Sequence, residues 1–139
     1  MKAIYTTKAT VTGGRAGKAK SSDGNLDIEL SVPKEFGGPG GKGTNPEQLF
    51  AAGYAACFES AVRHIATEQK KKITDASVTA TVGVGPRKEG GFGLAVSLDV
   101  TVKGMDRADA QKIVDLAHNV VCPYSNALRG NVDVKVKLH

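Results

Sequence analysis

The stretch that decides the fold of this 139-residue chain is residues 45–61, NPEQLFAAGYAACFESA. Asn45 is a suitable N-cap and Pro46 suits the first helical position, because the start of a helix leaves N–H groups without intrahelical partners. From Pro46 to about Gln69 the residues favour helix, apart from Gly53. The middle of the stretch is apolar or small on every side, which is typical of a buried helix. We therefore predict a long buried central helix with Cys57 in its middle.

Strand patterns precede this helix. Residues 4–12 are rich in β-branched side chains, residues 18–21 could form a short return strand, and apolar residues alternate with polar ones over residues 26–32. Asp23-Gly24 between the last two segments is typical of a hairpin turn. This part of the chain is predicted to form an antiparallel meander.

Strand patterns also follow the helix. Residues 78–84 and 92–102 alternate on either side of a glycine-rich turn and predict a long hairpin with one buried face. Asp106 is placed to cap a second helix, which Pro123 should stop near Cys122. Residues 132–138 predict a last strand. The order of elements indicates an α+β fold.

The length indicates a single domain spanning residues 1–139. No run approaches the ~20 apolar residues of a membrane span, and the N-terminus lacks the apolar region of a secretory signal. We therefore expect the protein in the cytoplasm, with no membrane as a partner. The formal net charge of +5 is too modest to indicate a nucleic-acid partner.

Two glycine-rich segments invite comparison with phosphate-binding loops. That motif requires Gly, four residues, and then Gly-Lys-Ser/Thr. Gly17-Lys18 is followed by alanine, and Gly43 is followed by Thr44 where lysine is required. Neither segment predicts nucleotide binding.

Four interpretations of Cys57 and Cys122 remain open. They could be inert core residues, since free cysteine is often buried, or a structural disulfide, which a cytosolic setting disfavours. They could belong to a metal site with His64 and His118, although Cys57 and His64 lie about 10 Å apart along a helix. Finally, they could form a redox pair in which one sulfur attacks an oxidant and the other closes a disulfide.

The redox interpretation requires a nearby cation. The attacking sulfur must be a thiolate, and burial raises the pKa of a thiol. Arg15, alone in a glycine-rich turn, is the candidate cation. A carboxylate could hold its guanidinium in a bidentate pair, and Glu47 and Glu59 are the nearest in sequence.

The chain resembles the organic hydroperoxide resistance proteins of the OsmC/Ohr family nearly end to end. The matching segments are residues 10–15 (TVTGGR), 21–24 (SSDG), 43–58 (GTNPEQLFAAGYAACF), 90–94 (GGFGL), 117–118 (AH), 121–127 (VCPYSNA) and 129–134 (RGNVDV). The VCPYSN and NPEQLF segments together favour the hydroperoxide branch of the family.

This resemblance implies a function. It implies a thiol-dependent peroxidase acting on alkyl and fatty-acid hydroperoxides, with no bound cofactor or metal. Cys57 would be the peroxidatic cysteine, Cys122 the resolving cysteine, and Arg15 and Glu47 the polar pair that activates Cys57. A dithiol, with lipoylated proteins preferred, would be the external reductant.

The resemblance also implies an OsmC/Ohr-like fold, an intertwined homodimer with antiparallel sheets around the central helix. Glu47 and Cys57 are ten residues apart, which is about 15 Å of helical rise, too far for both to contact one arginine. We therefore expect each site to combine Cys57 and Cys122 of one chain with Arg15 and Glu47 of its partner. The alternative function is a non-enzymatic lipid-binding or stress-sensing module with inert cysteines.

Overall fold

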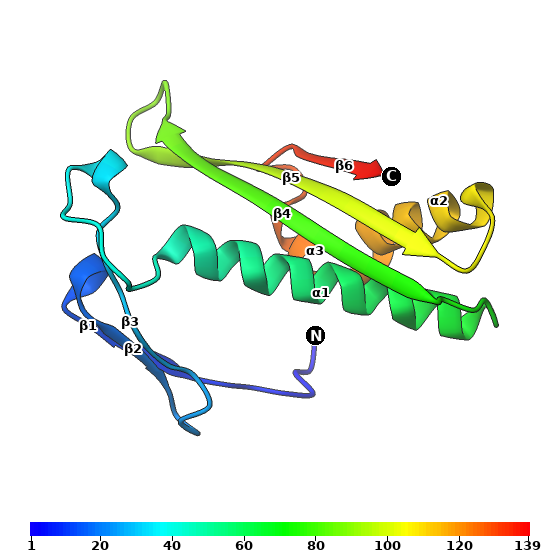
Figure 1. Cartoon of the computed structure of the whole chain (residues 1–139), viewed down its shortest axis with the longest axis horizontal. Helices are drawn as coiled ribbons and strands as arrows, with labels where there is room; N and C mark the ends of the chain where they lie inside the picture. Colours follow the sequence, from blue (N-terminus) through cyan, green and yellow to red (C-terminus); the bar gives the residue numbers. More distant parts are fainter. The chain divides into compact units, whose positions relative to one another are not determined.

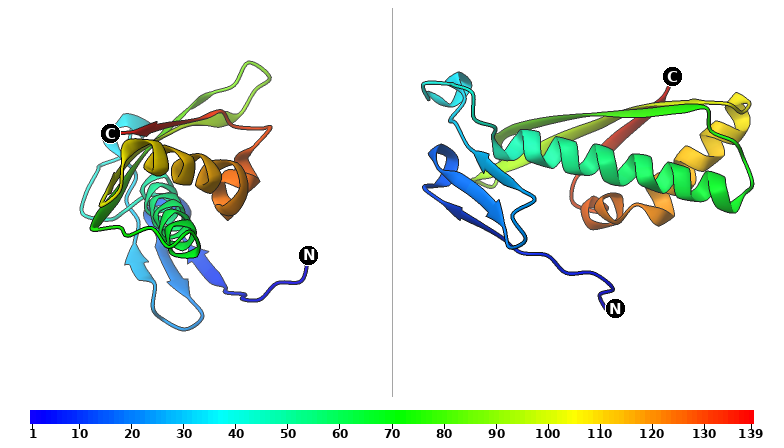
Figure 2. Two further views of the ribbon diagram at one scale, coloured as in Figure 1. Left: turned by 90° about the vertical axis from the view of Figure 1, so that its right-hand side faces the viewer. Right: turned by 60° about the horizontal axis from the view of Figure 1, so that its bottom comes forward.

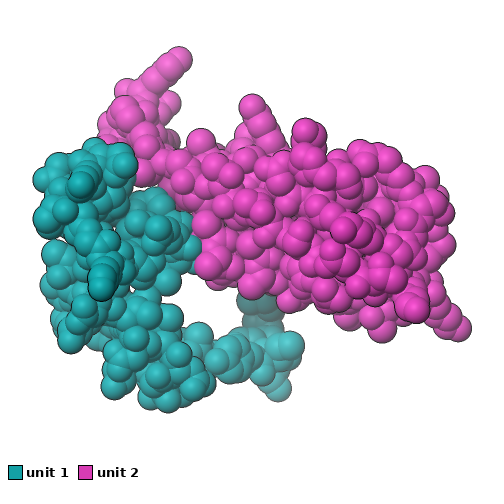
Figure 3. Space-filling view, viewed as in Figure 1, with its two compact units in different colours: residues 1–49 teal, residues 50–139 magenta.

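Two three-stranded sheets and the helices between and after their strands make up an α+β fold, as predicted. The structure is a computed structural model that describes residues 1–139 (Figure 1). The chain divides into two units, residues 1–49 and residues 50–139 (Figure 3). Each sheet lies within one unit, so the units are described separately.

The first unit contains a small antiparallel sheet in the order β1-β2-β3. Its elements are β1 (Ala9–Thr12), the 3₁₀ turn η1 (Gly14–Ala16), β2 (Lys18–Ser21), β3 (Asp27–Glu29) and the 3₁₀ turn η2 (Lys34–Phe36). The meander prediction is confirmed, but β1 begins at Ala9 rather than Ile4. Only Ala19 and Leu30 of this unit are buried, so the first sheet has little core of its own.

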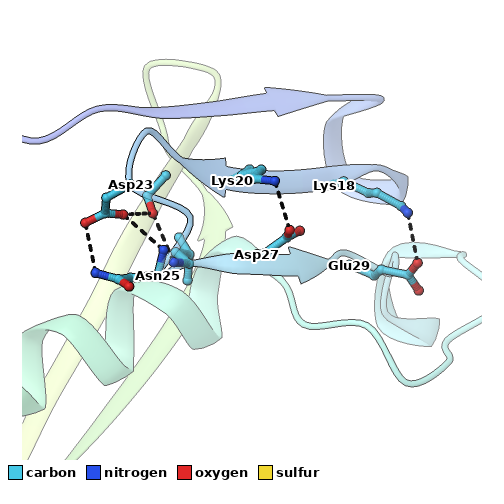
Figure 4. Close-up of polar contacts among 8 residues, drawn as sticks. Lys18, Lys20, Asp23, Asn25, Asp27 and Glu29 are labelled. Carbon is cyan, nitrogen blue, oxygen red and sulfur yellow. Dashed lines mark hydrogen bonds and ion pairs between the residues drawn. The ribbon is translucent and has the colours of Figure 1, made fainter.

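Ionic pairs cross the exposed side of this sheet (Figure 4). Lys18 Nζ lies 3.4 Å from Glu29 Oε1, and Lys20 Nζ lies 3.3 Å from Asp27 Oδ2. These residues are direct cross-strand partners in the β2–β3 register, where opposite charges are favourable neighbours. Asp23 accepts hydrogen bonds from the Ser21 hydroxyl and the Asn25 backbone, which supports the predicted hairpin turn.

The second unit contains the longer elements. They are α1 (Pro46–Glu68), whose first turn belongs to the first unit, β4 (Asp75–Pro86), β5 (Phe92–Lys103), α2 (Arg107–Leu116), the π-helical turn η3 (Ala117–Val121), α3 (Pro123–Leu128) and β6 (Val134–Leu138). Strands β4 and β5 form the predicted hairpin, paired from Asp75 with Lys103 to Pro86 with Phe92. From Phe50 onward α1 lies on the same face of the sheet as α2 (Figure 2).

The expectation of antiparallel sheets, which the family resemblance implies, is wrong for the last strand. Strand β6 pairs in parallel with β5, with Val96 opposite Val134 and Val100 opposite Leu138. The segment between the two strands is long and largely helical, and it returns the chain to the starting end of β5. A crossover of this kind is what parallel neighbours require.

Alternation along β5 builds the core of the second unit. Val96, Leu98, Val100 and Val102 are all buried, and they share one hydrophobic cluster with residues of α1 and α2. The helical members include Tyr54, Phe58, Val62, Ile113 and Val114. The alternating apolar residues of β5 therefore pack against the apolar faces of the helices, as the sequence pattern predicts.

The prediction that α1 is buried on all sides is not met in the single chain. One face is buried, through Tyr54, Phe58, Ala61, Val62, Ile65 and Ala66. Ala52 and Ala56 on another face are exposed, and Cys57 is half-buried. The even distribution of small side chains in the sequence conceals this asymmetry, because alanine occurs on both the buried and the exposed face. None of the helices combines the length and apolar character needed to cross a membrane.

The second predicted helix is confirmed at its start and differs at its end. The Asp106 side chain accepts a hydrogen bond from the Asp109 backbone, which is the expected N-cap. The helix then widens into η3, and a separate helix, α3, begins at Pro123. Proline stops one helix and starts the next, because its missing N–H and fixed φ suit a first helical position.

Candidate functional site

The two cysteines lie next to each other in the second unit. Cys57 Sγ of α1 and Cys122 Sγ are 3.6 Å apart, and both thiols are free. Cys122 is fully buried, whereas Cys57 is half-buried. The two side chains, 65 residues apart in sequence, are therefore within one small movement of a disulfide, whose S–S bond is about 2.05 Å long.

Local backbone geometry presents Cys122 to α1. Its backbone is extended, with φ −68° and ψ 116°, as expected for a residue before proline. The Cys122 amide still donates to the Ala117 carbonyl at 2.9 Å, the bond that closes the π-helical turn. Cys122 thus lies at the junction between η3 and α3, with Pro123 at the start of α3.

The surroundings of Cys57 oppose its ionisation within the single chain. Burial raises the pKa of the Cys57 thiol, and the neighbouring Cys122 raises it further. A hydrogen bond from the Tyr124 backbone acts in the opposite direction. Because a thiolate is the nucleophilic form, Cys57 requires an additional positive partner to react rapidly near pH 7.

Arg15 and Glu47 form the predicted bidentate pair in the first unit. Arg15 Nη1 donates to Glu47 Oε2 at 2.8 Å, and Nη2 donates to Oε1 at 2.7 Å. The guanidinium carbon also lies 5.1 Å from the centre of the Phe36 ring. The Arg15 hydrogen bonds hold the pKa of the Glu47 carboxyl below its usual value. Two parallel charge-assisted bonds restrict the orientation of the guanidinium as well as its position.

Glycines shape the turn that carries Arg15. Gly13 and Gly14 have φ of 76° and 56°, which L side chains rarely adopt. A side chain at Gly17 would collide with the Thr12 carbonyl oxygen. The glycine-rich segment therefore encodes a tight 3₁₀ turn around Arg15 rather than a phosphate-binding loop.

The start of α1 holds Glu47. The Asn45 side chain accepts a hydrogen bond from the Gln48 backbone at 2.8 Å, so Asn45 is the N-cap that the sequence predicts. Glu47 lies in the first helical turn. Glu59, the other candidate carboxylate, pairs instead with Arg63 one helical turn away.

Sequence reasoning missed a chain of polar contacts close to the cysteines. The Tyr54 hydroxyl lies 2.8 Å from Ser125 Oγ, which in turn lies 3.2 Å from His118 Nδ1. The sequence indicates His118 only as a candidate metal ligand together with His64, and His64 lies beside Glu68. Tyr54 and Ser125 are 71 residues apart, and no local pattern indicates their contact.

Comparisons of sequence and fold with known proteins agree on one family. Residues 38–137 match the family model of OsmC-like proteins. The chain is 56% identical over 138 residues to an organic hydroperoxide resistance protein of Xanthomonas axonopodis pv. citri, covering 99% of this chain and 96% of that protein. It is 49% identical over 140 residues to the organic hydroperoxide resistance protein OhrB of Bacillus subtilis, covering 98% of each.

A solved structure agrees with these relatives. The crystal structure of an organic hydroperoxide resistance protein from Legionella pneumophila superposes with a TM-score of 0.93 at 52% sequence identity, covering 99% of this chain and 98% of that one. Fold and sequence are thus similar to the same group of proteins along almost the whole chain. The chain belongs to the OsmC-like family and, within it, to the organic hydroperoxide resistance (Ohr) proteins.

Proposed function

We propose that this protein is a thiol-dependent peroxidase that reduces alkyl and fatty-acid hydroperoxides to alcohols and so contributes to organic peroxide resistance in the cytoplasm. The observation that carries the proposal is the 3.6 Å separation of two free sulfurs, Cys57 Sγ and Cys122 Sγ. Family membership supports the substrate class, because relatives named for organic hydroperoxide resistance match over the full chain.

The reaction begins at Cys57. Its thiolate attacks the outer oxygen of the hydroperoxide, the O–O bond breaks, and the alkoxide takes a proton and leaves as the alcohol. Cys57 is thereby oxidised to a sulfenic acid. In this proposal Arg15, oriented by Glu47, stabilises the Cys57 thiolate and the negative charge that develops on the leaving oxygen.

Cys122 completes the oxidation. Its sulfur attacks the Cys57 sulfenic sulfur, the S–O bond breaks, and the hydroxide leaves as water with the proton that the Cys122 thiol loses. A free dithiol or a lipoylated protein then attacks the disulfide and returns both thiols while becoming oxidised itself. The cycle needs no bound cofactor.

Two variants test these roles by measuring consumption of tert-butyl hydroperoxide with dithiothreitol as reductant. Cys57→Ser should abolish turnover. Cys122→Ser should still be oxidised once at Cys57 but should form no intramolecular disulfide. Retention of full activity by Cys57→Ser would refute the peroxidase proposal and favour a lipid-binding or stress-sensing module.

We further propose that the active unit is a homodimer with shared sites. Glu47 and Cys57 are separated by ten residues of the continuous helix α1, about 15 Å of rise. Ala52 and Ala56 form an exposed small-residue face on this helix, which would allow close approach of a second helix. Each site would then combine Cys57 and Cys122 of one protomer with Arg15 and Glu47 of its partner.

Mixing two inactive variants tests this arrangement. If sites are shared, a mixed dimer of Cys57→Ser and Arg15→Ala protomers has one site with both substitutions and one site with neither. Activity should therefore reappear after the two variants are unfolded together and refolded. If all four residues act within one protomer, the mixture stays as inactive as its components.

A further inference from the structure

A chain of three polar side chains beside the cysteines has no role in the proposed chemistry. Tyr54 is fully buried, and Ser125 is the buried polar residue of the core, at 1% exposure. Their hydroxyls lie 2.8 Å apart, and His118 Nδ1 extends the chain at 3.2 Å from Ser125. A buried hydroxyl without a partner is unfavourable, so each group depends on its neighbour.

The chain joins the two segments that carry the sulfurs. Tyr54 precedes Cys57 by three residues on α1, and Ser125 follows Cys122 by three residues on α3. Residues three apart on a helix are neighbours on its surface. The Tyr54–Ser125 hydrogen bond therefore spans the same helix–helix junction as the pair of sulfurs, about one helical turn away.

His118 anchors the far end of the chain. It lies in the π-helical turn η3, and its ring packs near Phe58, with ring centres 6.4 Å apart. Burial lowers the pKa of the His118 imidazole, and Arg129 lowers it further, against the opposing carboxylates of Asp115 and Asp133. A neutral imidazole can accept a hydrogen bond from the Ser125 hydroxyl at Nδ1. The Ser125 oxygen is then free to accept a hydrogen bond from the Tyr54 hydroxyl.

We propose that Tyr54 and Ser125 are positioning residues for closure of the Cys57–Cys122 disulfide, with His118 orienting the Ser125 hydroxyl. The step they serve is attack of the Cys122 sulfur on the Cys57 sulfenic sulfur, which releases water. They hold α3 against α1 so that the two sulfurs stay within reach after Cys57 is oxidised. The first step, attack of Cys57 on the hydroperoxide, does not depend on them. This inference rests on the proposed function.

The test separates the two steps by time. After mixing with tert-butyl hydroperoxide, quenched samples are alkylated, and mass spectrometry counts the thiol, sulfenic acid and disulfide forms. Ser125→Ala and Tyr54→Phe should each slow conversion of sulfenic acid to disulfide by about three- to tenfold, the range that corresponds to one lost hydrogen bond. Formation of sulfenic acid should change less than twofold. Ser77→Ala is the matched control, because Ser77 is an exposed serine of β4 that lies outside the helices carrying the two cysteines.

A double variant distinguishes positioning from general stability. Tyr54→Phe combined with Ser125→Ala leaves no unpaired hydroxyl between the helices, so its resistance to urea should exceed that of Ser125→Ala. Closure should nevertheless stay slow, because the bond between α1 and α3 is still missing. Recovery of closure together with stability would assign these residues a purely structural role and overturn the inference.

The remaining outcomes of these experiments also test the positioning role. Equal slowing of both steps, or unchanged closure in Tyr54→Phe, which keeps the packing of the ring, would overturn the inference. If the unsubstituted protein forms neither sulfenic acid nor disulfide, the proposed function itself fails, which is a different result.

Discussion

Replacing Glu47 with glutamine removes the charge that holds Arg15 while leaving the size of the side chain almost unchanged. In the structure both carboxylate oxygens accept hydrogen bonds from the guanidinium, at 2.7 and 2.8 Å. Glutamine retains a single acceptor oxygen and no charge. The substitution therefore loosens the orientation of Arg15 and leaves Cys57 and Cys122 untouched.

The exposure of the pair sets the size of this effect. A hydrogen bond to a charged group contributes roughly 1.5–3 kcal/mol in a desolvated setting. The Arg15 side chain is 41% exposed and the Glu47 side chain 15%, so water screens the pair. After this discount we expect a loss of about 1 kcal/mol, near the upper end for exposed ion pairs. If that energy orients Arg15 for catalysis, kcat/KM should fall about fivefold.

The assay is the initial rate of tert-butyl hydroperoxide reduction with excess dithiothreitol, at hydroperoxide concentrations well below KM. The matched control is Glu29→Gln, which makes the same chemical change in the exposed pair with Lys18. The control should change kcat/KM by less than 1.5-fold, and both variants should keep the melting temperature within a few degrees. An unchanged kcat/KM in Glu47→Gln, or an equal loss in Glu29→Gln, would contradict the role of the Arg15–Glu47 pair.

Three further predictions concern the Cys57 sulfur, the hydrophobic core and the N-cap of α2. Burial raises the pKa of the Cys57 thiol, and the proposed contact with Arg15 lowers it. In a Cys122→Ser background, Arg15→Ala should therefore move the pH midpoint of Cys57 alkylation by iodoacetamide upward. An unchanged or lower midpoint would contradict the contact. Ile113→Ala should lower the free energy of unfolding in urea by about 2–5 kcal/mol, because Ile113 is fully buried, and a loss below 1 kcal/mol would argue against this core. Asp106→Ala should lower it by about 1 kcal/mol through loss of the N-cap, whereas no change in urea would show that α2 does not depend on that cap.

Local signals predicted much of this structure. Asn45 and Pro46 marked the start of α1, Asp106 marked the start of α2, and alternation marked both strands of the β4–β5 hairpin. Each of these signals depends on residues a few positions apart, so it can be recognised from the sequence alone. The need of an activated thiolate for a cation pointed to Arg15, but it left the carboxylate open between Glu47 and Glu59, and the family resemblance alone indicated Glu47.

Long-range pairings were not predictable from local patterns. The parallel placement of β6 depends on the path of the whole segment after β5, and α3 is too short to show a helical period. The evenly small residues of α1 concealed which face is buried, because alanine is compatible with core and surface alike. The Tyr54–Ser125–His118 chain joins α1, α3 and η3, and its members look ordinary when each is read in its own segment.

The most direct test of the account is to count thiols after adding one equivalent of tert-butyl hydroperoxide per chain under anaerobic conditions. The account predicts that both thiols disappear rapidly, that one equivalent of alcohol forms, and that peptide mapping finds Cys57 linked to Cys122 within one chain. If both thiols persist and the hydroperoxide is recovered intact, the adjacent sulfurs are not a redox pair and the proposed peroxidase chemistry is wrong.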